Sequence, residues 1–248
     1  MGLLKPFIDF IEECIDKTAG KMRGISMLEL GDQTCGGHGI KEATGKEYFE
    51  TRGVYHTSVD MNGKHGALVV DLTKCFDNPD WVGAFNVVTN SGTSEHVAPF
   101  EGQYTCFQNI HDCLKVNGVA IHIVPDVADL SILGRLEHHC PYYYSEEFFR
   151  QLIQDNAYKL IALKTYQGLL LCCYQKKKKK PFSDDAESFL KNIYIRHWGR
   201  SAITPDVERA QAYARLESKT IDKPQKYKHG WESDEIPAIE DVIIETEL

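Results

Sequence analysis

Long apolar runs, metal-type cysteine spacings and a leader segment are all missing from this 248-residue chain. No apolar run approaches the ~18 residues that a membrane-spanning helix requires, so we expect no membrane partner. The eight cysteines are scattered, without a Cys-x-x-Cys pair or a Cys/His spacing typical of zinc sites, and no signal peptide precedes them. We therefore expect no bound metal, and reduced, mostly buried thiols in a cytoplasmic protein.

A surplus of positive charge is missing as well. The chain carries a formal net charge of −8, and the seven acidic residues from residue 230 onward, where Lys and Arg are absent, account for most of it. The first 229 residues hold 28 basic and 29 acidic side chains and are therefore almost neutral. Nucleic-acid-binding domains concentrate Lys and Arg on one face, so this balance argues against a nucleic-acid partner.

Alternating helical and strand-like patterns fill the first 175 residues. Apolar spacing predicts helices at about 3–18, 40–51, 102–116 and 145–155. Apolar runs predict seven strands, at about 25–30, 55–60, 66–71, 85–90, 118–124, 158–165 and 168–174. Only Tyr166 and Gln167 separate the last two strands, and so short a connection requires an antiparallel hairpin. We therefore expect an α/β fold with a doubly wound, seven-stranded sheet, mostly parallel with an antiparallel last strand, plus extra N-terminal and C-terminal helices.

The composition changes twice along the chain. Residues 1–175 form the predicted sheet domain, including its N-terminal helix. Five lysines, Lys176–Lys180, then open residues 176–219, which we expect to form a C-terminal helical extension. The lysine run is either a solvated linker or a patch for nuclear import or for an anionic surface. Residues 220–248 are polar and acidic, and we expect a partly disordered tail there.

Three successive strands end on a carboxylate. The segment Met27–Thr34 reads Met-Leu-Glu-Leu-Gly-Asp-Gln-Thr, with Glu29 in the strand and Gly31 at a sharp turn. Asp60 and Asp71 end the next two apolar runs. Ligands of α/β proteins bind at the carboxyl ends of the strands, and glycine lets the backbone turn tightly against them. This layout predicts a nucleoside-binding edge.

The order of these features, over residues 24–175, resembles the class I S-adenosylmethionine-dependent methyltransferases, whose sheet is Rossmann-like. In that family the first strand and its Gly-rich turn contact the methionine part of the cofactor, and Glu29–Thr34 occupies that place. The carboxylate after the second strand holds the ribose hydroxyls, which matches Asp60, and the one after the third takes the adenine amino group, which matches Asp71. The resemblance therefore implies S-adenosyl-L-methionine as the cofactor. It implies contacts from Glu29, Gly31, Asp32, Gln33, Asp60, Met61, Asp71, Leu72, Asn90, Ser91 and Gly92.

Features after the fourth strand extend the resemblance. The segment Thr93–Val97 reads Thr-Ser-Glu-His-Val, similar to the Glu-His-Val found there in small-molecule methyltransferases. Leu114–Gly118 resembles the family's Leu-Lys-Pro-Gly-Gly turn and is expected to end a helix. The Asn-Pro-Pro-Tyr-type motif of amino-methylating nucleic-acid enzymes is missing, since residues 89–92 read Thr-Asn-Ser-Gly. A small molecule is therefore the expected acceptor.

The glycine turn departs from the family's Gly-x-Gly-x-Gly pattern. Only Gly31 stands in register, with Gln33 and Cys35 at the other two positions. The Gln33 side chain could either crowd the cofactor or hydrogen-bond its amino or carboxylate group, and the sequence leaves both open. Asp71 has a second interpretation too, because Asp-Leu-Thr also serves as a helix N-cap.

Two histidine segments and a carboxylate are candidate catalytic groups. The resemblance places Glu95 and His96, after the fourth strand, and His138 or His139, after the fifth, beside the methyl acceptor. A neutral imidazole there takes a proton from a hydroxyl or amine nucleophile near pH 7. The alternatives are structural roles in a helix turn and in a loop. Cys140 follows the two histidines directly, which is too close for one metal centre without ligands from elsewhere, so a metal site is the third and least favoured alternative.

The leading hypothesis is therefore an S-adenosylmethionine-dependent methyltransferase with a small-molecule substrate, and self-association into a homo-oligomer stays open. Methyl transfer from a sulfonium is a direct displacement, in which the protein mainly positions the nucleophile and excludes water. One alternative is a catalytically inactive methyltransferase-like binding or scaffold protein, which the degenerate glycine turn favours. The other is a nicotinamide-dependent oxidoreductase, against which the final hairpin and the missing Gly-x-Gly-x-x-Gly argue.

Overall fold

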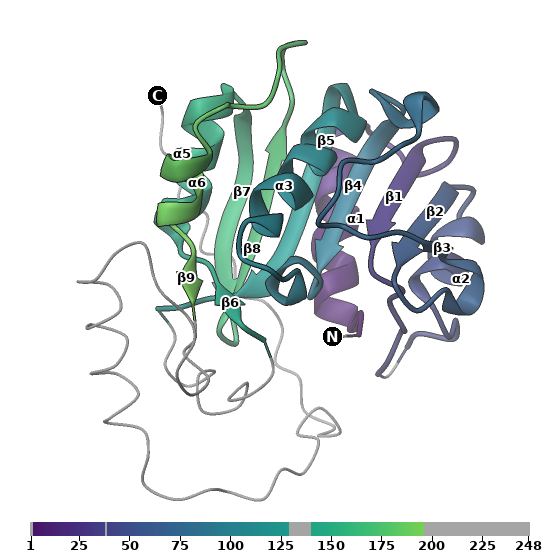
Figure 1. The fold of residues 1–248 in the computed structure, drawn as a ribbon. Helices are drawn as coiled ribbons and strands as arrows, with labels where there is room; N and C mark the ends of the chain where they lie inside the picture. Colours follow the sequence, from purple (N-terminus) through teal and green to yellow (C-terminus); the bar gives the residue numbers. More distant parts are fainter. Residues whose placement is uncertain (1, 38, 129–139, 196–248) are drawn as a thin grey trace, which may run out of the picture.

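The computed structural model describes residues 2–37, 39–128 and 140–195. Its centre is a seven-stranded sheet with the strand order β3-β2-β1-β4-β5-β8-β7 (Figure 1). Strands β1 to β5 run parallel to their neighbours among these five, whereas β8 runs antiparallel to β5 and to β7. This arrangement confirms the mostly parallel sheet with an antiparallel last strand. The strands are β1 Ser26–Leu30, β2 Tyr55–Asp60, β3 Leu68–Val69, β4 Phe85–Ser91, β5 Leu114–Pro125, β7 Lys159–Tyr166 and β8 Leu169–Gln175.

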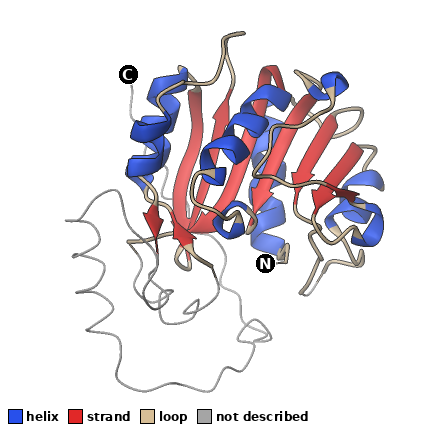
Figure 2. Cartoon of the chain, in the orientation of Figure 1, coloured by secondary structure: helices blue, strands red, loops and turns tan. Residues whose placement is uncertain are grey.

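Helices cover both faces of the sheet and enclose two hydrophobic cores (Figure 2). Helices α1 and α2 pack on one face, against side chains such as Met27 and Val87. Helices α3, α5 and α6 pack on the other face, against the adjacent residues Leu28 and Val88. Successive strand residues point to opposite faces, so continuous apolar runs are what a doubly covered sheet requires. The helices are α1 Lys5–Thr18, α2 Gly45–Glu50, α3 Gly102–Cys113, α5 Glu146–Asn156 and α6 Ala186–Lys191.

Capping residues set where the helices start. The Thr44 side chain accepts a hydrogen bond of 3.1 Å from the Glu47 backbone, so α2 begins at Gly45 and not at residue 40 as predicted. The Ser145 side chain caps α5 in the same way, through the backbone N–H of Phe148 at 3.1 Å. The predicted start of α5 is therefore correct to one residue.

Two predicted boundaries are wrong for local reasons. Strand β3 has only two residues because a 3-10 turn, η1 (Lys64–Gly66), occupies the residues in front of it. Helix α3 ends at Cys113, three residues before the predicted end, because Leu114 already pairs with Phe85 of β4. The predicted helix-ending turn is thus an irregular start of β5, in which Asn117 has a left-handed φ of +67°.

The C-terminal part of the described chain rests on the sheet domain. Lys176 is buried and donates to the His111 carbonyl at 2.7 Å, and Lys180 donates to the Asp155 carbonyl at 2.8 Å. Both ends of the lysine run therefore bind the domain, unlike a solvated linker. Beyond α6, β9 (Tyr194–Ile195) pairs antiparallel with β6 (Tyr142–Tyr143). The rest of the predicted extension and the acidic tail, residues 196–248, lie outside the described residues.

The structure bears on two expectations from the sequence: the lack of a membrane-spanning helix and the burial of the cysteines. Across the described ranges, none of the helices is both long and apolar enough to cross a membrane. All eight cysteines are free thiols, and six of them are buried. The thiols thus behave mainly as small apolar core residues.

Candidate functional site

A pocket of about 560 Å³ lies at the carboxyl edge of the parallel strands. The loops after β1, β2, β3 and β4 form its walls, and these four strands are neighbours in Figure 1. Nine of the predicted site residues line it: Gly31, Asp32, Gln33, Asp60, Met61, Asp71, Leu72, Gly92 and His96. Glu29, Asn90, Ser91 and Glu95 are described but do not line it. His138 and His139 lie outside the described residues.

The Asp60 carboxylate sits at the end of β2 and is oriented by two backbone N–H groups. Asp32 donates to Oδ2 at 2.9 Å, and Asn62 donates to Oδ1 at 2.8 Å. An ionised carboxylate has about four acceptor positions, so each oxygen keeps one for a ligand in the pocket. The site can therefore accept two hydroxyl donors at once.

The turn after β1 is closed by side chains. Gly31 has a φ of +89°, which favours glycine, and a Cβ there would lie 2.4 Å from Thr93 Oγ1 and 2.6 Å from Gln33 Nε2. Gln33 donates to Thr93 Oγ1 at 3.2 Å, and Thr93 donates to the Leu30 carbonyl at 2.8 Å. The Gln33 Oε1 atom is buried without a partner. Other atoms of Gln33 line the pocket, so this unsatisfied acceptor lies directly behind its wall.

Glu29 lies behind this turn and is 2% exposed. Burial raises the pKa of its carboxyl well above the usual range, and a hydrogen bond from the Gln33 backbone opposes this. His56 Nε2 lies 3.7 Å from Glu29 Oε2, and burial lowers the His56 pKa to about 4. Glu29 thus braces the turn from the core side, and its side chain does not face the pocket.

The end of β4 is fixed by a buried polar network. Asn90 donates to Ser94 Oγ at 2.8 Å and lies 3.0 Å from His122 Nδ1. The Ser94 hydroxyl in turn donates to the Tyr144 oxygen at 2.8 Å, and the Tyr144 hydroxyl donates to Gln103 Oε1 at 2.7 Å. Asn90 does not line the pocket, and its bonds hold the turn that presents Gly92 and Thr93.

The Asp71 side chain is already occupied by its own turn. Its Oδ1 accepts from the Thr73 backbone at 3.0 Å and from the Thr73 hydroxyl at 2.6 Å, and Lys74 lies 3.2 Å from Oδ2. The Thr73 hydroxyl bond is the main cause that lowers the Asp71 pKa. This geometry agrees with the turn-capping interpretation. Leu72 is buried beside it, whereas Met61 is 69% exposed at the rim.

Glu95 and His96 take opposite directions from one 3-10 turn, η3 (Ser94–His96). His96 is exposed and lines the pocket. Glu95 is fully buried, and among the described residues its carboxylate oxygens have no hydrogen-bond partner beyond its own backbone N–H. Burial raises its pKa to about 7, and its charge raises the pKa values of Cys106 and Tyr144 nearby. A buried, unpaired acid of this kind is a candidate functional group.

Several lining residues escaped the sequence prediction. Thr93 follows β4 directly, and its position after a strand end could have identified it. Gly2 lines the pocket because the N-terminal segment crosses the turn, where the Leu3 backbone donates to the Thr34 carbonyl at 2.8 Å. No local pattern in the sequence indicates that crossing, which depends on where α1 packs.

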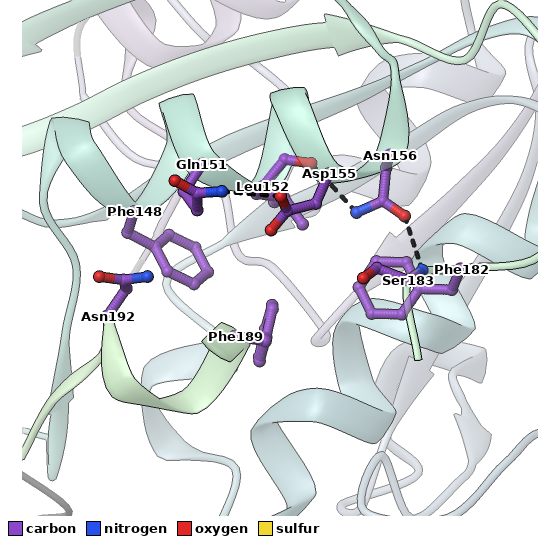
Figure 3. Close-up of a pocket in the computed structure, with 9 residues that line it drawn as sticks. All are labelled: Phe148, Gln151, Leu152, Asp155, Asn156, Phe182, Ser183, Phe189 and Asn192. Atoms are coloured by element: carbon purple, nitrogen blue, oxygen red, sulfur yellow. Dashed lines mark hydrogen bonds between the residues drawn. The ribbon is translucent and has the colours of Figure 1, made fainter. Parts of the chain in front are cut away.

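A second hollow lies between α5 and α6 (Figure 3). Its polar lining groups are paired with the protein: Gln151 donates to Asp155 at 2.7 Å, and the Ser183 backbone donates to Asn156 at 2.9 Å. About 10 Å³ of space remains, room for one water molecule. Within the described residues, clusters of three or more metal-ligating side chains are also absent. The pocket at the strand ends is therefore the candidate site.

Comparison with known proteins relates this architecture to solved structures. Neither a protein-family model nor a curated protein matches the chain. The N-methyltransferase NodS from Bradyrhizobium japonicum, crystallised with S-adenosylhomocysteine, has a TM-score of 0.50 at 11% identity, covering 70% of this chain and 89% of NodS. For 1,6-didemethyltoxoflavin-N1-methyltransferase from Burkholderia thailandensis the TM-score is 0.46 at 15% identity, with 67% and 76% of the two chains covered.

The TehB-like S-adenosylmethionine-dependent methyltransferase from Corynebacterium glutamicum gives a TM-score of 0.44 at 17% identity, covering 68% of this chain and 88% of that one. Together with the strand order and the final antiparallel pair, the likeness to NodS defines the fold. The chain has the class I methyltransferase fold, as its sequence resemblance implied.

Proposed function

We propose that this chain is an S-adenosylmethionine-dependent methyltransferase that acts on a small-molecule acceptor. The observation that carries the proposal is the Asp60 carboxylate, which stands at the end of β2 in a pocket of about 560 Å³ and keeps two acceptor positions for a ligand. A vicinal diol donates two hydroxyl hydrogens, so a ribose fits this group. NodS, which shares the fold, was crystallised with S-adenosylhomocysteine.

The remaining pocket residues fit the other parts of this cofactor. The Gln33 amide lies at the pocket and its Oε1 lacks a partner among the described residues, so we propose that it turns toward the cofactor's amino group and accepts from it. Gly92 would let the backbone approach the cofactor closely, Gly31 shapes the turn beside it, and Leu72 would pack on the adenine ring. Asp32 and Met61 would contact the ribose side, and Asp71 would reach the adenine amino group through its free acceptor positions.

Glu29, Asn90 and Ser91 would serve the cofactor from behind the pocket wall. Glu29 accepts from the Gln33 backbone, and Asn90 holds the turn after β4 through Ser94. We therefore propose indirect roles for these residues, in place of the direct contacts that the resemblance implied. Their removal would loosen the two turns against which the methionine part of the cofactor lies.

The acceptor would enter next to His96. When bound, the cofactor supplies a sulfonium-activated methyl group, so no metal is needed and the protein has to align the nucleophile and exclude water. We propose that His96 takes a proton from a hydroxyl or amine acceptor. Glu95 is buried beside His96 and would act on it indirectly, and His139, outside the described residues, is the other proposed catalytic group. The almost neutral charge of residues 1–229 supports a small molecule over a nucleic acid.

One observation favours a second function, a methyltransferase-like protein that binds ligand without catalysis. The Gln33 and Thr93 side chains fill the space over Gly31 that a second glycine would leave open. If that space is needed for the methionine part of the cofactor, only the nucleoside end would bind. Adenosine would then bind as tightly as S-adenosylhomocysteine.

Calorimetric titration of the full chain tests the proposal. We expect S-adenosylhomocysteine to bind more tightly than adenosine, and NAD not to bind. Equal affinities for S-adenosylhomocysteine and adenosine would favour the binding protein, and binding of NAD alone would favour the oxidoreductase. Incubation with radiolabelled S-adenosylmethionine and panels of phenols, amines and carboxylic acids then identifies the acceptor class. His96→Ala should lower the rate of labelling without changing S-adenosylhomocysteine affinity.

A further inference from the structure

The loop after β2 is tied to the loop after β1 across the rim of the pocket. His65 Nδ1 lies 2.7 Å from Asp32 Oδ2, and the Asp32 backbone donates to Asp60 Oδ2 at 2.9 Å. An ionised carboxylate only accepts, so the imidazole Nδ1–H is the donor. The Asp32 side chain is 5% exposed, whereas that of His65 is 48% exposed. Asp32 therefore links the imidazole to the Asp60 carboxylate.

The turn that carries His65 is built to hold this side chain in place. His65 has a φ of +48°, in the left-handed region that non-glycine residues rarely adopt, between Gly63 at +62° and Gly66 at +82°. The Asn62 side chain accepts from the Lys64 backbone at 2.6 Å, and the Asn62 backbone donates to Asp60. A strained backbone is kept where its surroundings determine it, often at functional sites.

The imidazole is also the hydrogen-bond partner of a nearly buried carboxylate, that of Asp32. Asp32 raises the pKa of Glu29 by its negative charge, so the acids behind and beside the turn influence one another. Without the imidazole, the nearly buried Asp32 carboxylate would lack its one hydrogen-bond partner among the described residues. His65 does not itself line the pocket, so any effect on a ligand passes through Asp32.

We propose that His65 is a positioning residue that, acting through Asp32, orients the Asp60 carboxylate for the two hydroxyls of a ribose. The inference rests on the proposed function, because it takes a ribose as the ligand of Asp60. Its consequence is specificity: the chain distinguishes a ribonucleoside from a 2′-deoxyribonucleoside more strongly while the His65–Asp32 bond exists.

The test is calorimetric titration of the full chain with S-adenosylhomocysteine and with its 2′-deoxy analogue. Wild type should bind the first about tenfold more tightly, because the analogue lacks one charge-assisted hydrogen bond. His65→Gly, which removes the ring but tolerates the left-handed φ, should weaken S-adenosylhomocysteine binding about fivefold and the analogue less than twofold. His65→Asn tolerates the same φ and carries an amide donor near the Nδ1 position, so it should restore most of the discrimination.

The control is Lys64→Ala, which removes a positive charge from the same turn and leaves the His65–Asp32 bond; it should discriminate as wild type does. Equal weakening of both ligands in His65→Gly, or no weakening of either, would overturn the positioning role while leaving the proposed function intact. Failure of His65→Asn to restore discrimination would overturn it as well. Wild type that binds neither nucleoside would instead contradict the proposed function, and this inference with it.

Discussion

The two sides of the pocket differ in how far their acidic groups are already paired. On the side of β2 and β3, both Asp60 oxygens accept backbone N–H groups, and Asp71 accepts two bonds from Thr73. On the side of β4, Glu95 is fully buried, and no other residue in the described part of the chain donates a hydrogen bond to its oxygens. One side thus has fixed carboxylates with remaining acceptor positions, whereas the other carries an acid that nothing in the described protein satisfies.

The two kinds of acidic group have opposite energetic consequences: the paired carboxylates are preorganised for a ligand, whereas the buried Glu95 carboxyl destabilises the folded state. A carboxylate held by backbone donors presents a defined geometry before the ligand arrives, so less order has to be created on binding. A buried, unpaired carboxyl instead costs free energy in the folded state, and such groups concentrate at functional sites. We interpret the β2 side as the end that recognises a constant ligand. On the β4 side, the buried Glu95 carboxyl lies behind the pocket wall, directly before His96, which lines the pocket.

We expect the largest loss of ligand binding from Gly31→Val, which alters the turn next to the paired carboxylates. The new Cβ would approach Thr93 and Gln33 to within 2.6 Å, in a backbone with φ of +89°. S-adenosylhomocysteine binding should be abolished while circular dichroism still reports the sheet. The new side chain would clash with Thr93 and Gln33 and so distort the turn; it would not overlap the ligand itself. Gly24→Val is the matched control, since φ is +86° there and a Cβ would meet nothing within 4 Å. Equal losses in both variants would contradict this explanation.

The next effect concerns the unpaired side and depends on pH. The Glu95 pKa is about 7 in the folded protein, against an ordinary 4.5, so the folded state holds its proton more tightly. The free energy of unfolding therefore falls as the pH rises from 4.5 to 7. The difference between the two pKa values corresponds to a loss of about 3 kcal/mol. Glu95→Gln removes this loss and should exceed wild type in the free energy of unfolding by about that amount at pH 8, but hardly at pH 4.

Urea denaturation of both proteins at several pH values measures this difference. Glu187→Gln, on the exposed surface of α6, is the control and should show no such trend. A stability difference between Glu95→Gln and wild type that stays constant with pH would mean that the buried carboxyl finds a partner in solution. The contrast between the two sides of the pocket would then disappear.

The sequence predicts the fold better than it predicts element boundaries. Continuous apolar runs and a two-residue connection were enough for the strand number and the antiparallel hairpin, because a doubly covered sheet leaves few other arrangements. The short β3 and the early end of α3 depend on a turn in front of Leu68 and on pairing between Leu114 and Phe85. Such pairing is a tertiary contact, which local periodicity does not contain.

For the site, the sequence locates strand ends but not side-chain directions. Asp60 and Gly31 follow their strands directly, so their place at the pocket could be predicted from position alone. Glu29 and Asn90 precede the strand ends, and the pleat turns their side chains into the protein. The contribution of Gly2 depends on how α1 packs across the sheet, for which no residue pattern near the pocket gives a signal.

A smaller loss of ligand affinity is expected from Asp60→Ala, which tests the paired carboxylate at the end of β2. Asp60→Ala should weaken S-adenosylhomocysteine binding by roughly 1.5–3 kcal/mol, because two charge-assisted hydrogen bonds to the ribose vanish. Calorimetry measures the change, and circular dichroism checks that the fold is intact. Asp60→Asn should lose less, since one acceptor oxygen remains. Unchanged affinity in Asp60→Ala would remove this residue from the site.

The smallest effect is expected from Asp71→Ala, and it separates two carboxylates that look equivalent in the sequence. Asp71 Oδ1 already accepts two bonds from Thr73, and Lys74 lies beside Oδ2 in a position open to solvent. Any hydrogen bond to an adenine amino group therefore competes with water and with a nearby ammonium, so S-adenosylhomocysteine affinity should fall less than about threefold. Titration of Asp71→Ala and Asp60→Ala under identical conditions gives the ratio directly. A loss in Asp71→Ala as large as that in Asp60→Ala would show that Asp71 leaves its own turn to bind the ligand. The pairing seen at this edge would then describe only the ligand-free geometry.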